Sequence, residues 1–197
     1  MTLPKGRSKS ELQKVYGKKF RQFNLHHMIP SSCGGLTNEF NLFPYKTKSH
    51  SAYNYLFLNM SIWQVWERTQ EIHRAIFDSG DEFINRHWLE VCCIRCENEK
   101  RRQIEKRMSV IELQEQWRKA FGGESLQQAR KILKFMMLFM VFGSRMANTD
   151  HLFNNGNLIE FFEKYPANED RLRAFNICFG ESVDCSRIKT KMSKILR

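Results

Sequence analysis

The apolar pattern in the first third of the chain predicts two short strands followed by a helix. Residues 23–29 are rich in side chains that suit a strand, and Pro30 ends this run because proline cannot donate a hydrogen bond to a β-ladder. A glycine-containing loop follows. Residues 40–45 then predict a second strand, expected at a sheet edge, and the helical spacing of apolar residues after Thr47 predicts a helix with a Thr or Ser cap.

Beyond this segment the apolar spacing is mainly that of helices. The run 131–142 is apolar and rich in Met and Phe, but it is far shorter than the roughly 20 residues that span a bilayer, so we expect a buried helix and no membrane association. Packing inside the same molecule is favoured over docking to a partner or a second copy. Helices are predicted over 62–76, 124–142, 158–165 and 169–179. A further predicted helix begins at 83 and becomes strongly basic beyond 95.

The net positive charge of the chain indicates which kinds of partner it can bind. The 197 residues include 32 Lys and Arg against 21 Asp and Glu, a formal net charge of +11. Nucleic acid is the natural partner of such a chain, because each phosphate that a basic side chain neutralises releases counterions. The alternatives are a basic chain that is merely soluble and one that drifts towards anionic membranes. Residues 1–22, which include Arg21, form a basic arm that either lies along a phosphate backbone or is a solvated terminus.

Cysteine usage and the first residues indicate a reducing compartment. The six cysteines do not form the even framework of secreted domains, and the N-terminal segment lacks the apolar core of a signal peptide. We therefore expect a cytoplasmic protein. Cys93 and Cys96 have the spacing of half a zinc site, but no second pair follows at a suitable distance, and a zinc ion there is not favoured.

The geometry of the predicted strand and helix indicates which polar side chains can face the same point. His50 and Asn54 are four apart on the predicted helix and therefore share one face. His26 and His27 are neighbours on a strand, so only one of them can face a given ion directly unless the strand is irregular. This arrangement permits one histidine to bind a metal while its neighbour acts as a base.

The same stretch resembles the HNH nucleases, which have the ββα-metal fold. The matching residues, in order and spacing, are His26-His27, Ile29-Pro30, Gly34-Gly35, Asn41-Leu42 and His50. The resemblance covers roughly residues 20–60, under a quarter of the chain. Many relatives also have a Cys-x-x-Cys zinc knuckle ahead of the last ligand, whereas Lys46 and Ser49 occupy those places here. A structural zinc is therefore not expected at this point.

The resemblance implies a role for each matched residue. His26 and His50 would bind a divalent cation, with Asn54 as a third ligand, and His27 would be the general base that activates a water molecule. Asn41 would orient His27. Mg²⁺ or Mn²⁺ is expected, and Zn²⁺ or Ni²⁺ would also suit two imidazoles and an amide. Contacts with nucleic-acid phosphates are expected from Arg21, Lys46 and Lys48.

The sequence therefore predicts an α+β protein with a small ββα-metal nuclease module followed by a mostly α-helical region. The expected domains are the arm 1–22, the module 23–60, and the helical region 61–197, which packs on the module or on a partner. The expected activity is metal-dependent hydrolysis of phosphodiester bonds, with DNA favoured over RNA. The alternative is a non-catalytic binding protein, inhibitor or subunit on a degenerate HNH fold. Oligomerisation through helix 131–142, sequence specificity, the physiological metal and the pathway are left open.

Overall fold

The computed structural model divides the chain into two compact units that interleave along the sequence. It describes residues 22–89, 94–148, 158–165 and 168–180, with the single positions 10, 11 and 14. Unit 1 comprises 1–17, 37–43 and 134–197, and unit 2 comprises 18–36 and 44–133. Almost all of the predicted basic arm, including Arg21, lies outside the described residues. The predicted domain boundaries stay predictions.

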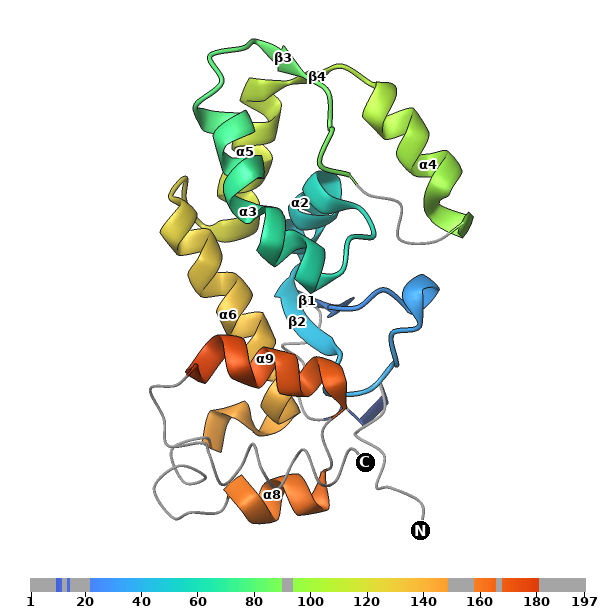
Figure 1. The fold of residues 1–197 in the computed structure, drawn as a ribbon, viewed down its shortest axis with the longest axis vertical. Helices are drawn as coiled ribbons and strands as arrows, with labels where there is room; N and C mark the ends of the chain where they lie inside the picture. Colours follow the sequence, from blue (N-terminus) through green and yellow to red (C-terminus); the bar gives the residue numbers. More distant parts are fainter. Residues whose placement is uncertain are drawn as a thin grey trace. The chain divides into compact units, whose positions relative to one another are not determined.

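The protein has an α+β fold in which helices predominate and two small antiparallel sheets are present. The first sheet pairs β1 (Phe23–His27) with β2 (Leu42–Lys46), as the strand pattern predicted. The second sheet pairs β3 (Phe83–Ile84) with β4 (Met108–Ser109), so that Phe83 lies opposite Ser109 and Ile84 opposite Met108. Figure 1 shows both sheets among the helices.

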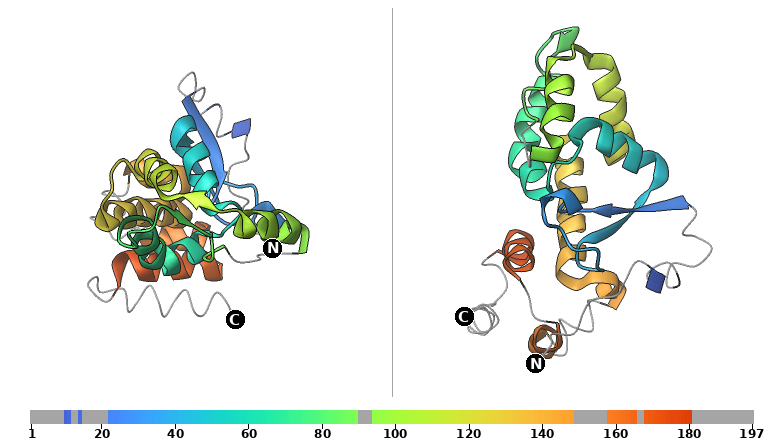
Figure 2. Two further views of the ribbon diagram at one scale, coloured as in Figure 1. Left: turned by 90° about the horizontal axis from the view of Figure 1, so that it is seen from above. Right: turned by 90° about the vertical axis from the view of Figure 1, so that its right-hand side faces the viewer.

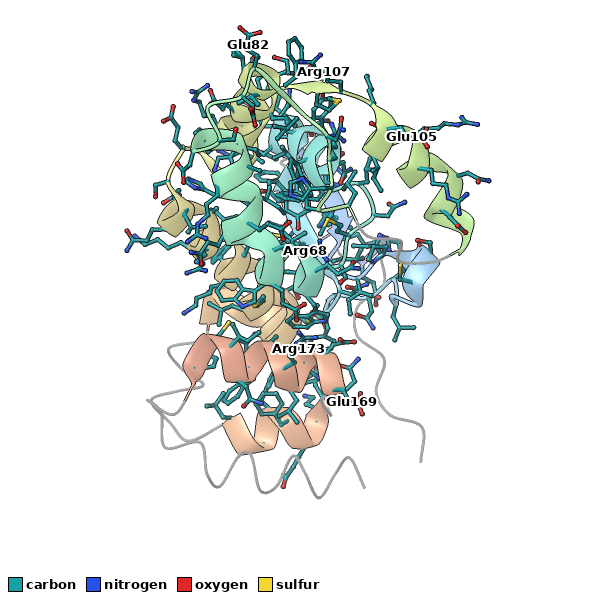
Figure 3. The ribbon with its side chains drawn as sticks, turned by 45° about the horizontal axis from the view of Figure 1, so that its top comes forward. Arg68, Glu82, Glu105, Arg107, Glu169 and Arg173 are labelled. Atoms are coloured by element: carbon teal, nitrogen blue, oxygen red, sulfur yellow. The ribbon has the colours of Figure 1, made fainter. Side chains whose placement is uncertain are left out.

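The prediction that a helix begins at Phe83 was wrong. Residues 83–84 are extended because their backbone pairs with a strand more than twenty residues later, and pairing at that distance leaves no signal in local spacing. The guanidinium of Arg107 lies 4.5 Å from the Phe83 ring centroid, and the Val110 amide donates to the Glu82 carbonyl at 2.9 Å. Glu82 and Arg107 lie close together at this end of unit 2 (Figure 3). The polar helix is α4 (Ile94–Glu105), which begins later than predicted.

Helix α2 (Thr47–Phe57) follows β2 directly. Its Ala52, Tyr53, Leu56 and Phe57 side chains are buried, as predicted from their spacing. The predicted Thr or Ser cap was wrong, because the chain leaves β2 at Lys46 and Thr47 is already helical. Lys46 occupies the cap position and makes no capping hydrogen bond from its side chain.

Two further helices, α3 (Ile62–Phe77) and α5 (Val110–Phe121), belong to unit 2. Helix α3 begins at a capping box formed by Ser61 and Gln64 and buries one apolar face. Helix α5 ends at Gly122, whose φ of 73° suits glycine because it has no β-carbon. Helix α2 packs on β1 and along α5, and α3 also contacts α5 (Figure 2). The predicted helix over 62–76 is therefore confirmed, whereas α5 was not predicted as a separate helix.

Unit 1 is built from helices and the short segment 37–43. It contains the second half of α6 (Leu126–Phe142), the 3-10 helix η3 (Gly143–Asn148), α8 (Leu158–Lys164) and α9 (Glu169–Phe179). The predicted buried helix is confirmed: of the side chains in its apolar run, Leu133, Met136, Met137, Met140, Val141 and Phe142 are buried. In the described part of the chain, no helix is long and apolar enough to cross a membrane.

A buried carboxylate attaches segment 37–43 to the helices of unit 1. Glu39 accepts hydrogen bonds from the backbone amide and the hydroxyl of Ser144, at 3.2 and 2.6 Å, and forms an ion pair with Arg145 at 2.6 Å. The Arg171 guanidinium lies 3.9 Å from the ring centroid of Phe40. These contacts make segment 37–43, which carries Asn41 and the first two residues of β2, part of unit 1.

Candidate functional site

The histidines of β1 and α2 meet in unit 2. The Nδ1 atom of His26 lies 3.2 Å from the Nε2 atom of His50. One helical turn after His50, the amide nitrogen of Asn54 lies 3.3 Å from the same Nε2 atom. The predicted shared face of His50 and Asn54 is therefore confirmed, and the packing of α2 on β1 brings His26 to that face.

The surroundings of His26 keep its imidazole neutral. Its side chain is 7% exposed and makes edge contacts with the rings of Tyr53 and Tyr45, at centroid distances of 4.8 and 6.2 Å. Burial, together with the smaller effect of positive charge on His50 and His27, lowers the pKa of His26 to about 3. A neutral imidazole has a lone pair on one ring nitrogen, which is the form that binds metals.

His50 is held from two sides. Its Nδ1 atom lies 3.4 Å from the Asn24 side-chain nitrogen, while its Nε2 atom lies near His26 and Asn54. Partial burial lowers its pKa, which also favours the neutral ring. Asn24 was not among the predicted site residues, although a signal was present: Asn24 is two residues before His26 and therefore shares its face of β1.

His26, His50 and Asn54 line a polar cleft of about 490 Å³ together with His27. His27 is half-buried at the last position of β1, where the strict alternation of a strand no longer applies, and it lines the same cleft as His26. The lining residues are Leu25, His26, His27, Pro30, Ser31, Ser32, His50, Asn54, Leu58, Asn59 and Met60. The structure thus brings together the predicted base and the predicted metal ligands.

The remaining predicted residues have different positions. Asn41 is 6% exposed, and its backbone amide donates to the Asn38 carbonyl at 3.1 Å. It belongs to unit 1, so its orienting role towards His27 stays a prediction. Lys46 and Lys48 are exposed at the start of α2, where their side chains are accessible to phosphates. Arg21 lies outside the described residues.

The donor atoms in the cleft come from two imidazoles and an amide. Among the described residues, no three His, Cys, Asp or Glu side chains form a metal-binding group. Two imidazole nitrogens at about 2.0–2.1 Å from one ion would lie about 2.8–3.4 Å apart at octahedral or tetrahedral angles. The separation of 3.2 Å between the His26 and His50 nitrogens, which is also the distance of a hydrogen bond between the two rings, lies within that range, and the Asn54 amide adds an oxygen donor if its two terminal atoms are exchanged. The site therefore fits an ion held by two imidazoles and an amide.

No cysteine side chain in the described part of the chain lines this cleft. Cys33 is half-buried in the 3-10 helix η2 (Ser31–Cys33), with its Sγ 3.9 Å from the Ser32 hydroxyl. The adjacent Gly34 has a φ of 86°, which agrees with the predicted glycine loop. Cys93 lies outside the described residues, as does the side chain of Cys96, so the zinc alternative at this pair stays open.

Comparisons of the chain with protein-family models, with curated proteins and with solved structures found no match. The class of protein must therefore be argued from the cleft and its residues.

Proposed function

We propose that this protein is a metal-dependent endonuclease of the HNH type that hydrolyses phosphodiester bonds in nucleic acid, with DNA favoured over RNA. The main support is the separation of 3.2 Å between the His26 and His50 nitrogens, in a cleft that His27 also lines. Two neutral imidazoles at this distance suit one divalent ion, and the adjacent imidazole is suited to accept a proton from water.

The local fold supports the finer proposal of a ββα-metal module. The first sheet and α2 follow each other as β1, β2 and α2, and α2 packs on β1. The proposed ligands come from the first strand and the helix, as the resemblance implies. The net charge of +11 agrees with a polyanionic substrate, because basic side chains gain free energy when they displace counterions from phosphates.

Each residue of the proposed site has a separate task. His26 and His50 hold the ion, and Asn54 is the third ligand through its amide oxygen. The ion would stabilise negative charge on the phosphate and on the leaving oxygen. His27 takes the proton from the attacking water, and the role of Asn41 in orienting its ring stays a prediction from the resemblance. Lys46 and Lys48, exposed beside His50 on α2, attract the phosphate backbone.

The direct test is cleavage of supercoiled plasmid at low salt. The natural protein, His27→Ala and His87→Ala are compared with Mg²⁺, with Mn²⁺ and with EDTA. His87 is the matched control because it lies outside the cleft and is exposed, with its Nε2 atom 3.2 Å from the Glu71 carboxylate. We expect metal-dependent cutting by the natural protein and by His87→Ala. His27→Ala should cut at least about 100-fold more slowly, because it lacks the general base.

Metal binding is tested separately by isothermal titration calorimetry with Mn²⁺. His26→Ala and His50→Ala should each weaken binding, whereas His87→Ala should not. Cutting that continues in EDTA, or equally in His27→Ala, would contradict the proposal. A natural protein that shifts the plasmid on a gel without cutting it would instead support the non-catalytic binding alternative.

A further inference from the structure

The turn that follows α2 contains a strained residue. Leu58 has φ 47° and ψ −125°, and among the described residues it is the only one other than glycine with a positive φ. Leucine disfavours this region because its β-carbon approaches the backbone, and glycine is usual there. Such strain persists only where neighbouring contacts enforce it, and it is concentrated at functional sites.

Backbone hydrogen bonds on both sides enforce this conformation. The Leu58 amide donates to the Asn54 carbonyl at 2.8 Å, and the Met60 amide donates to the Phe57 carbonyl at 3.0 Å. The second bond closes a four-residue turn in which Leu58 takes the first central position, with the angles of a type II′ turn. The Ile62 amide then donates to the Met28 carbonyl at 2.8 Å, which ties the end of the turn to the residue after β1.

The strained residue is part of the cleft wall. Leu58 is half-buried and lines the cleft together with His26, His27, His50 and Asn54. Most of the other lining side chains are imidazoles, hydroxyls and amides, which suit an ion and a phosphate. Leu58 and Leu25 add half-buried apolar surface to this polar cleft, and apolar surface suits the sugar or base of a nucleotide.

We propose that Leu58 is a substrate-positioning residue whose side chain contacts the sugar or base of a nucleic-acid strand in the cleft. This inference rests on the proposed function, which supplies nucleic acid as the substrate. The enforced turn sets the direction of the side chain before substrate arrives, so little conformational freedom is lost on binding. Metal binding does not involve Leu58 and should be independent of it.

Two substitutions distinguish the effect of the Leu58 side chain from the effect of its backbone strain. Leu58→Ala and Leu58→Gly both remove the atoms beyond the β-carbon, but only glycine adopts a φ of 47° without strain. The glycine variant should therefore have a higher urea midpoint than the alanine variant. Both variants should bind a fluorescein-labelled single-stranded DNA oligonucleotide about tenfold more weakly than the natural protein, because each loses contact worth about two buried methylene groups.

Binding is measured by fluorescence anisotropy in EDTA at low salt, so that cleavage does not interfere. Leu36→Ala is the matched control, because Leu36 is 63% exposed and does not line the cleft. Calorimetry with Mn²⁺ should give the same affinity for both Leu58 variants as for the natural protein. Natural affinity for DNA in both variants would overturn the inference. So would affinity that is lost in the alanine variant and restored in the glycine variant, because that result indicates a purely structural role.

The binding assay also separates this inference from the proposed function. If the plasmid stays intact while both variants bind DNA tenfold more weakly, the nuclease proposal fails and the role of Leu58 stands. If the plasmid is cut and both variants bind normally, the nuclease proposal stands and the role of Leu58 is wrong. A natural protein with no affinity for the oligonucleotide would overturn the role of Leu58 as well.

Discussion

Acid should destabilise this protein through His26. The folded state holds the His26 ring neutral, because burial lowers its pKa to about 3. In the unfolded chain the same ring has an ordinary pKa of about 6.5 and takes up a proton as the pH falls. Between these two values the unfolded state binds more protons than the folded state, so the free energy of unfolding decreases as the pH is lowered.

The expected size follows from the two pKa values. Above pH 6.5 both states hold His26 neutral, and the stability is fully present. Below pH 6.5 the free energy of unfolding falls by about 1.4 kcal/mol per pH unit until the folded ring is protonated near pH 3. The loss from His26 between pH 7 and pH 5 is then about 2 kcal/mol. Burial also lowers the pKa of His50, which adds a loss of the same sign.

Urea unfolding followed by tryptophan fluorescence measures this loss. The natural protein and His26→Gln are compared at pH 7 and pH 5 in EDTA, so that no metal ion is bound. Glutamine does not titrate, so the difference between the two pH values should be smaller in this variant by about 2 kcal/mol. His87→Gln removes an exposed histidine and should keep the full difference. An equal pH dependence in the natural protein and in His26→Gln would refute the reasoning, because His26 would then titrate alike in both states.

Two further predictions concern the surroundings of the cleft. Tyr45→Phe should lower the free energy of unfolding by about 1–2 kcal/mol. The buried hydroxyl donates to the Ala120 carbonyl at 2.7 Å, and its loss leaves that carbonyl unsatisfied. Urea unfolding measures the change, and unchanged stability would contradict the prediction. Lys46→Gln combined with Lys48→Gln should lower the slope of log binding constant against log salt for DNA by about two, because each exposed lysine neutralises one phosphate. Anisotropy titrations at several salt concentrations measure that slope, and an unaltered slope would place the bound strand elsewhere.

Much of the proposed site could be predicted from local sequence. The spacing of His50 and Asn54 places them on one helix face at any position of that helix, and the apolar run before Pro30 identifies the strand that carries His26 and His27. These relations depend only on the periods of helix and strand. The approach of His26 to His50 followed from the resemblance rather than from the periods, because it requires α2 to pack on β1.

The residues that were missed depend on contacts between distant positions or on a backbone angle. Asn24 was recognisable from the period of β1, but only the packing of α2 shows that it reaches His50. The strain at Leu58 results from hydrogen bonds made by the preceding helix and from the tie of Ile62 to Met28. A leucine carries no local signal for a positive φ.

The sequence by itself determined most of the helices, the first pair of strands, the glycine loop and the basic charge, because these follow from side-chain periods, from turn residues and from composition. Only the tertiary structure decided that Phe83 lies in a strand, that Tyr45 bonds to Ala120 and that Asn41 belongs to unit 1. Each of these features depends on groups far apart in the chain, whose approach is set by the burial of apolar surface and by the pairing of buried polar groups.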